Sequence, residues 1–427
     1  MKTPFKLSAL CLSLFASQAY ASGFALIEQS ASGQGLSYAG AAASTEDASV
    51  MWFNPAGMTA IKGHEIIVGT HVILPSAKFN NEGSYVKNSD GSTSPLRGAD
   101  DDGAQMGIVP NFYWKGQMGN YDLGFGFNVP YGSTVDYDQY WVGRYNAVYT
   151  ETKTYNFNPS IARKVNDNLS VGFGLNAQYI NVNLTQKIDF GLTSTPQEND
   201  GYADLEASGW AYGYNLGLMV DFEKAGRLGL AFRSQISHNA TGKADFTTPA
   251  NVSSASYIDT NVSASVSLPA TASISYAYPF SQKTEILADA TWTGWSTFQE
   301  LRIEFDNPAK DDSVQPEEWT DSMRYSLGMT HQLNDTLKLR TGVAFDQTPI
   351  KNAQLRTPRI SDSDRTWVSV GAGYQLSKTL NLDVGYTHIF GGNPKIEATD
   401  ADTGSHVLQG NFDINIDIVS AQLVWKY

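Results

Sequence analysis

Apolar and polar residues alternate along most of the chain with a period of two. In one such stretch the apolar residues are Val171, Phe173, Leu175, Ala177 and Tyr179, with glycine or an amide residue between them. Residues 122–129 and 380–386 show the same alternation. Because successive side chains of a strand point to opposite faces, the pattern predicts β-strands with one apolar and one polar face.

The connections between these predicted strands are long and short in turn. The long polar segments are 80–105, 133–150, 190–206, 247–263, 306–319, 351–364 and 391–410. The tight turns are 165–168, 223–226, 281–283, 334–336 and 377–379. Long loops at one end and short turns at the other are typical of outer-membrane barrels, and the segments after His64 amount to about fourteen strands.

The two ends of the chain support export to the outer membrane. Lys2 and Lys6 precede an apolar run from Leu7 to Ala16, which is followed by the cleavage-site pattern Ala19-Tyr20-Ala21. Residues 1–21 are therefore predicted to be a signal peptide cleaved before Ser22. The last predicted strand alternates up to a terminal aromatic residue, Tyr427. Such an ending resembles the signal that the barrel-assembly machinery reads.

Composition excludes several classes of protein. The net charge of −14 becomes −16 once the two signal-peptide lysines are removed, which argues against a nucleic-acid partner. After the signal peptide no apolar run approaches the roughly 18 residues of a membrane helix. The one cysteine, Cys11, leaves with the signal peptide, so the predicted mature chain has no thiol.

The segment 22–63 does not alternate and is rich in alanine, glycine and serine. It precedes the first predicted strand, so it is either a linker or a small domain folded into the lumen. A barrel of this size encloses more space than its own wall side chains fill. We therefore predict an all-β transmembrane antiparallel barrel at 64–427 with an N-terminal hatch at 22–63.

The chain resembles a known family in several strings of residues that occur in the family's order. They are Gly23-Phe24, Asn54-Pro55-Ala56, Trp141-Val142-Gly143-Arg144-Tyr145, Trp295-Ser296-Thr297-Phe298-Gln299-Glu300-Leu301, Arg340-Thr341-Gly342-Val343-Ala344-Phe345-Asp346 and Asp362-Ser363-Asp364-Arg365. The family is that of FadL and its relatives, outer-membrane transporters of long-chain fatty acids and aromatic hydrocarbons.

The resemblance implies a fourteen-stranded barrel whose hatch carries Asn54, Pro55 and Ala56. It also implies a route, in which a hydrophobic ligand is caught on extracellular loops, reaches an interior pocket and leaves sideways at a kinked third strand. Ser22, Gly23 and Phe24 are the residues implied to touch that pocket. Read without the resemblance, Asn54-Pro55-Ala56 is a defined turn, because proline fixes φ and removes a donor.

The third predicted strand ends in Val129, Pro130, Tyr131 and Gly132. A closed barrel has no edge strand that tolerates a missing donor, so Pro130 predicts an opening or bulge in the ladder. Prolines at positions 110 and 159 remove further donors in the neighbouring strands. The alternative is that the prolines only mark strand ends near the membrane interface.

Strand parity places several charged residues in the lumen, where we expect most of them to pair. They are Arg233, Arg302, Arg324 and Arg340, with Asp289, Glu304, Asp346 and Asp383. Residues considered for binding a ligand carboxylate are Lys187, Arg302, Arg324 and Arg340. By resemblance, the basic residues that meet the fatty-acid carboxylate fall near Gln186 or Lys187 and near Gln315. The apolar residues expected on the capture loops are Leu192, Tyr202, Leu205, Val252, Tyr257 and Ile258.

These features predict passive uptake of a hydrophobic small molecule by a monomer, in contact with outer-membrane lipid and lipopolysaccharide. No nucleotide-binding, metal-binding or hydrolase motif is present, so we expect neither cofactor nor enzymatic activity. Two alternatives remain open: a general diffusion porin, for which a hatch would have no use, and a phage or adhesin receptor. The acidic run Asp100-Asp101-Asp102 is either a cation site or a solvated loop.

Overall fold

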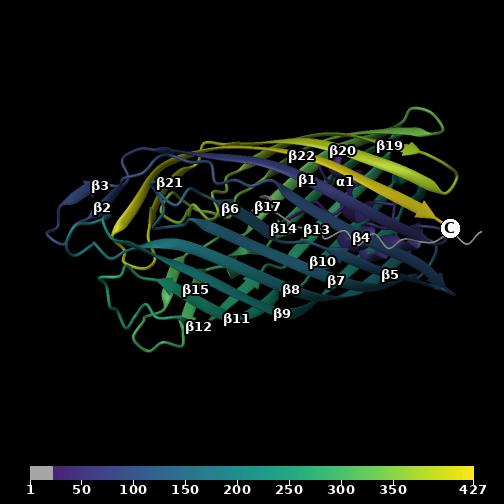
Figure 1. The fold of residues 1–427 in the computed structure, drawn as a ribbon. Coiled ribbons are helices and arrows are strands. Elements are labelled where there is room, and N and C mark those ends of the chain that lie inside the picture. The colour runs from purple at the N-terminus through teal and green to yellow at the C-terminus, as the bar shows by residue number, and fades with distance from the viewer. Residues whose placement is uncertain (1–22) are drawn as a thin grey trace, which may run out of the picture.

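The computed structural model describes residues 23–427 (Figure 1). The predicted signal peptide and Ser22 lie outside the described residues. Most of the described chain is strand, and the helices have only three to six residues. These are α1 (Ala31–Gln34), η1 (Ala41–Ala43), α2 (Val50–Phe53), η2 (Pro55–Ala60), η3 (Glu223–Ala225) and η4 (Trp295–Thr297). Among the described residues no helix is long and apolar enough to cross a membrane.

The strands form a closed, antiparallel barrel of 14 wall strands, as predicted. The segments are β1 (Glu65–Asn81), β2 (Tyr85–Lys87), β3 (Thr93–Pro95), β4 (Gly107–Met118), β5 (Tyr121–Asn128), β6 (Gly132–Asp136), β7 (Tyr149–Lys164), β8 (Leu169–Asp189), β9 (Asp200–Asp221), β10 (Arg227–Arg233), β11 (Ile236–Thr247), β12 (Thr260–Leu268), β13 (Thr271–Pro279), β14 (Thr284–Thr293), β15 (Glu300–Phe305), β16 (Ser313–Pro316), β17 (Ser322–Gln332), β18 (Leu337–Asp346), β19 (Arg365–Gln375), β20 (Leu380–Gly392), β21 (Lys395–Thr399) and β22 (His406–Lys426).

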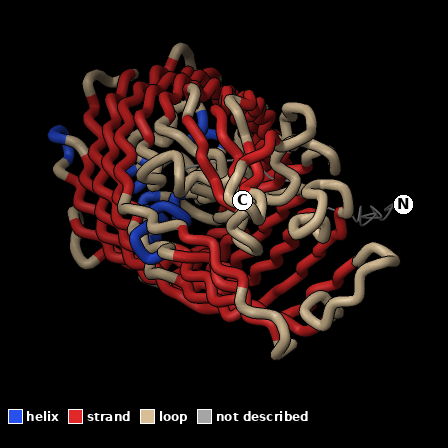
Figure 2. The backbone as a smooth tube through the Cα atoms, turned by 90° about the vertical axis from the view of Figure 1, so that its left-hand side faces the viewer, coloured by secondary structure: helices blue, strands red, loops and turns tan. Residues whose placement is uncertain are grey.

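The barrel closes between its first and last strands, because β1 pairs with β22 from Glu65↔Lys426 to Asn81↔Gly410. Six wall strands consist of two segments in sequence, and β5 with β6 is the pair that matters most below. The short hairpin of β2 and β3 extends the wall beside β22. Viewed along the axis, the strands form a ring around loops and short helices (Figure 2).

Side chains alternate between the two faces of the wall as the sequence pattern predicts. On β22, Val419, Leu423 and Trp425 are exposed on the outer face, whereas Ser420 and Gln422 are buried inside. An apolar outer face and a polar inner face are what a barrel in lipid requires. The predicted tight turns all join consecutive wall strands.

Strand segments occupy parts of several predicted loops, and two of these cases bear on the site. β8 and β9 remain paired up to Asp189↔Asp200, so the loop between them covers only residues 190–199. Tyr202 and Leu205 therefore lie on a strand and not on a loop. The loop predicted at 133–150 begins only after β6, which ends at Asp136. Polar strand residues beyond the membrane look like loop residues in the sequence, and this explains both errors.

The segment 24–61 packs against the inward-facing residues of the wall. Ala42 N donates to Ser275 Oγ (3.0 Å), and Ala31 N donates to Gln422 Oε1 (2.8 Å). A Cβ added at Gly342 would overlap the backbone of Leu36. The glycines of the wall thus let the segment lie backbone against backbone, which a larger side chain would prevent.

The loop after β6 folds into the other end of the barrel, away from the place where the segment 24–61 contacts β22. Its residues Tyr137, Trp141 and Tyr145 are buried, and the rings of Tyr137 and Trp141 stack at 4.0 Å. Trp141 also packs edge-on against Phe79 of β1. These residues join the largest apolar cluster of the described chain, so the core of this protein lies inside the barrel.

Candidate ligand-binding and exit site

The third wall strand is broken between β5 and β6. β5 pairs with both of its neighbours, β4 and β7, whereas the register of β6 runs along β7. The first residues of β4, Gly107 to Asn111, pair with β1 alone among the described strands. The ladder between the second and third wall strands is therefore open beside residues 129–131, here called the kink segment. Above it, Val135 forms an isolated bridge with Ala104.

Each of the three prolines singled out in the sequence lies where ladder hydrogen bonds are missing. Pro130 is in the kink segment, and Pro110 is on the part of β4 that faces the opening. At Pro159 the register between β7 and β8 skips residues 158 and 159. Because proline has no N–H, it is tolerated where no neighbouring strand needs one. Two of the three prolines therefore lie at the break itself, and the third lies on β7, the neighbouring strand.

The N-terminal residues bond to the kink segment from inside the barrel. Leu26 N donates to Pro130 O (2.7 Å), and Gly132 N donates to Phe24 O (2.8 Å). Ala25 and Tyr131 form an isolated antiparallel bridge between these two bonds. Residues 24–26, here called the N-terminal seal, therefore form a short strand that pairs with the kink segment from the lumen side.

An aromatic cluster surrounds Phe24. Its ring lies 5.2 Å from that of Trp295, 5.9 Å from that of Tyr131 and 6.0 Å from those of Phe298 and Trp319. Phe24 is thus held by groups from the kink segment and from residues around η4 and β17. The resemblance implied that Phe24 touches an interior pocket. Its ring is instead buried in this cluster, and the neighbouring residues 25–27 line the interior cavity described below.

Gly23 completes this arrangement. Its N–H donates to Asp362 Oδ2 (3.0 Å), and its φ of +62° falls in the left-handed region. A Cβ at this position would also overlap the ring of Trp319. Both constraints favour glycine, because only glycine combines a positive φ with no side chain.

An interior cavity lies between the seal, the kink segment and the wall. It is lined by Leu26, Pro130 and Tyr131 on one side. Trp52 and Phe53 of α2 line it as well, together with wall residues such as Arg233 and Arg324. The cavity therefore reaches from the break in the wall to the segment 24–61.

Parity placed six of the eight predicted lumen charges on the correct face. Arg340 bonds to Asp383 (2.7 Å) and to Glu46 of the N-terminal segment (3.0 Å). Arg233 lies over the ring of Trp52 (3.6 Å) and donates to Trp52 O. The remaining four, Arg324, Asp289, Asp346 and Asp383, are buried as expected, and Asp346 pairs with Arg365 (2.9 Å).

Arg302 and Glu304 lie on the outer face of the wall, so the prediction that they face the lumen was wrong. The Arg302 side chain is 42% exposed and bonds to Glu300 (2.8 Å) and Asp312 (3.1 Å), while its neighbours Leu301 and Ile303 line the pocket inside. Lys187 likewise points outward, with its Nζ 3.2 Å from Gln139 Oε1. The polarity of the wall inverts at this end of the barrel, where the lumen is an apolar pocket and the outer face meets water.

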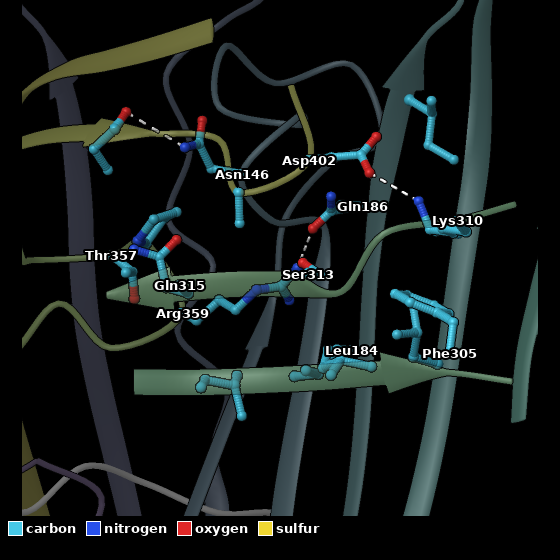
Figure 3. Close-up of a pocket in the computed structure, with 18 of the residues that line it drawn as sticks. Asn146, Leu184, Gln186, Phe305, Lys310, Ser313, Gln315, Thr357, Arg359 and Asp402 are labelled. Atoms are coloured by element: carbon cyan, nitrogen blue, oxygen red, sulfur yellow. Dashed lines mark hydrogen bonds and ion pairs between the residues drawn. The ribbon is translucent and has the colours of Figure 1, made fainter. Parts of the chain in front are cut away.

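That pocket, here called the upper pocket, is shown in Figure 3. Its apolar lining comes from β8, β9 and β15 and includes Leu184, Ile188, Leu205, Leu301 and Ile303. Of the residues expected on capture loops, Leu205 and Tyr257 line the pocket, and Leu192 packs on the core beside it. Tyr202, on the outer face near Lys187, does not line it, nor do Val252 and Ile258.

Polar groups meet at one side of the upper pocket. Gln186 and Gln315, the two positions matched to basic residues by resemblance, both line it. Arg359 reaches the same place from the loop before β19, and its Nη2 donates to Gln186 Oε1 (2.9 Å; Figure 3). Sequence reasoning missed Arg359, because it lies in a polar loop with no periodicity.

Arg359 brings positive charge to this side of the pocket without a bonded carboxylate. Its hydrogen bonds run to the carbonyl oxygens of Tyr149 and Thr185, to the hydroxyl of Thr150 and to Gln186. Desolvation lowers the pKa of the guanidinium to about 10, so it stays charged at neutral pH. Burial raises the pKa of the nearby Glu317 to about 8, so that carboxyl is mostly neutral at pH 7. No group of three or more His, Cys, Asp or Glu side chains that could hold a metal ion occurs within residues 23–427.

Comparison with known proteins agrees with this architecture. The 47 kDa outer membrane protein of Pasteurella multocida is 31% identical over 411 residues, covering 90% of this chain and 91% of that protein. The long-chain fatty acid transport protein of Salmonella typhi is 28% identical over 429 residues, covering 92% and 94%. The crystal structure of a Pseudomonas aeruginosa FadL homologue has the same fold, with a TM-score of 0.86 at 23% identity over 95% of this chain and 99% of that chain.

A family model described as "Outer membrane protein transport protein (OMPP1/FadL/TodX)" matches residues 12–427. The match covers the whole described barrel and the segment that packs inside it. The chain therefore belongs to the OMPP1/FadL/TodX family of outer membrane transport proteins, which are transporters of hydrophobic compounds and not enzymes.

Proposed function

We propose that this protein carries hydrophobic small molecules passively across the outer membrane. A ligand enters the upper pocket, moves to the interior cavity beside Phe24, and leaves sideways through the break in the third wall strand. The segment 24–61 acts as a hatch that prevents free passage of water and ions. Long-chain fatty acids and aromatic hydrocarbons are the proposed classes of ligand. One chain closes the barrel and holds both cavities, so the proposed working unit is a monomer.

The break in the third wall strand is the observation on which this proposal rests. A lateral exit needs a stretch of wall where side chains, and not a ladder of hydrogen bonds, separate the lumen from lipid. Residues 129–131 provide that stretch, and the interior cavity reaches it at Pro130 and Tyr131. On the lumen side the N-terminal seal is bonded to this stretch by two backbone hydrogen bonds, so it can leave without breaking the ladders of the wall.

Replacing Gly132 with arginine tests the exit. The long side chain at the first residue of β6 fills the opening, so uptake of a fluorescent fatty acid should fall at least about tenfold in cells that lack their own transporter. Ser92→Arg, at an exposed position in the β2–β3 loop, is the control and should leave uptake unchanged. The altered mobility of unheated barrel on a denaturing gel reports assembly. Unchanged uptake by a correctly assembled Gly132→Arg barrel would remove the lateral exit.

Arg359 is the residue we propose for recognising an anionic head group. It combines charge, an apolar pocket and hydrogen bonds to neutral acceptors that a ligand carboxylate would outcompete. A hydrogen bond to a charged group contributes about 1.5–3 kcal/mol. Arg302 and Lys187 point away from the pocket, so neither is proposed for this role any longer.

Arg359→Met should therefore weaken palmitate binding to the purified barrel by about tenfold to a hundredfold. Binding of hexadecanol, which has the same chain length and no charge, should change little. Arg359→Lys keeps the charge and should recover part of the palmitate affinity. Equal losses for palmitate and hexadecanol, measured by titration calorimetry, would mean that Arg359 only holds the loop in place.

A further inference from the structure

Lys310 places its ammonium group among aromatic rings at the edge of the upper pocket. Its Nζ lies 4.2 Å from the centroid of the Tyr257 ring, 5.0 Å from that of Phe305 and 5.5 Å from that of Phe246. Asp402 Oδ1 accepts a hydrogen bond from the same Nζ (2.9 Å; Figure 3). The lysine side chain is only 8% exposed, so its charge depends on these groups instead of water.

We infer that these three rings and Asp402 form a binding site for the cationic head group of an amphiphile, such as a quaternary ammonium, and that Lys310 occupies the site as a tethered cation. Aromatic faces attract cations, and several rings around one carboxylate are the usual means of recognising a quaternary ammonium. All four residues of the cage also line the upper pocket, whose apolar wall continues through Leu301 and Ile303. A bound amphiphile would therefore keep its head in the cage and its chain in the pocket.

The cage is held in shape by contacts that do not involve Lys310. Tyr257 OH donates to Asp402 Oδ2 (2.7 Å), so the carboxylate keeps its orientation when the lysine leaves. The Phe246 ring lies 5.5 Å from Tyr257 and 6.2 Å from Phe305. A preorganised site loses little when one cation replaces another.

Lys310 can leave the cage because it belongs to a connection and not to the wall. It lies between β15 and β16, in the loop 306–312, which is joined to the loop containing Tyr257 by the bond from Ser256 Oγ to Ala309 O (2.7 Å). The lysine side chain can swing into water by rotating about its own bonds, with the loop in place. The lysine ammonium is then hydrated by water, which compensates for its lost contacts with the cage. A ligand cation can therefore displace it.

Binding of two matched ligands to wild type and to Lys310→Ala tests this inference. The first is dodecyltrimethylammonium, and the second is an uncharged chain of the same length ending in a tert-butyl group. Lys310→Ala empties the cage and should bind the ammonium about tenfold more tightly than wild type, with no change for the neutral ligand. Lys243→Ala removes an exposed lysine on β11 and controls for net charge. Titration in maltoside micelles gives both affinities.

Two further variants ask whether the cage itself binds. In the Lys310→Ala background, Tyr257→Leu and Asp402→Asn should each abolish the gain for the ammonium. Persistence of the gain in both, or an equal gain for dodecyl sulfate, would overturn the inference. Because the inference rests on the proposed capture of ligands by the upper pocket, the neutral ligand separates the two ideas. If neither ligand binds any variant, the proposed capture itself fails, whereas neutral binding without a preference for the ammonium overturns the cationic site alone.

Discussion

A disulfide between cysteines introduced at positions 25 and 131 should stop uptake completely, and a reductant should restore it. Ala25 and Tyr131 face each other between the hydrogen bonds Leu26 N–Pro130 O and Gly132 N–Phe24 O. In an antiparallel pair this is the non-hydrogen-bonded position, where Cα atoms lie about 4.5 Å apart. That spacing falls within the range a disulfide spans. The bond would fix the N-terminal seal across the break, so a ligand in the cavity could no longer leave sideways.

The experiment is specific because Cys11, the one cysteine of the sequence, lies in the predicted signal peptide, so the predicted mature chain has no cysteine of its own. Each single cysteine variant shows how much uptake changes through loss of the original side chain alone, above all that of Tyr131 in the aromatic cluster. Ser237→Cys with Ser267→Cys is the matched control, since these two hydroxyls lie 2.8 Å apart on adjacent wall strands. That disulfide should form equally well and leave uptake unchanged. Full uptake by a barrel cross-linked at 25 and 131 would show that the seal does not need to move.

The barrel could be predicted from the sequence because its cause is local. Alternation of the kind seen at Val419, Leu423 and Trp425 follows from one strand lying between lipid and lumen, and every wall strand repeats it. Pro130 could be singled out for the same reason, since a missing N–H is a property of one residue. The tight turns were also local, as in Asn166, whose Oδ1 accepts from the N–H groups of Asn168 and Leu169.

The upper pocket could not be predicted, because its residues come from distant parts of the chain. Arg359 and Gln186 are 173 positions apart in the sequence, and no pattern in either segment predicts their contact. Parity failed here for a physical reason as well. The rule of apolar outside and polar inside holds only where lipid surrounds the wall, so it misplaced Arg302 and Glu304 at the end of the barrel. The N-terminal seal could not be predicted either, because its two backbone hydrogen bonds do not require particular residue types.

Deleting residues 25–62 should turn the closed protein into an open channel. In planar bilayers the intact protein should give no stable conductance steps, whereas the deletion variant should carry at least about tenfold more current per protein. The wall of this barrel exposes polar and charged side chains such as Arg340 and Asp383 to the segment 24–61. Without the segment these residues face an empty lumen that water can fill.

A single substitution offers a milder route to the same state. A side chain at Gly342 would overlap the backbone of Leu36, so Gly342→Ile should push the segment from the wall while the chain stays complete. Thr341→Ile places the same side chain on the outer face of the same strand and should leave the protein closed. Conductance in Gly342→Ile and in the deletion variant, with assembly verified by gel mobility, would assign closure to the segment 24–61. Large currents from the intact protein would instead favour the diffusion porin, because the lumen would then conduct around the segment.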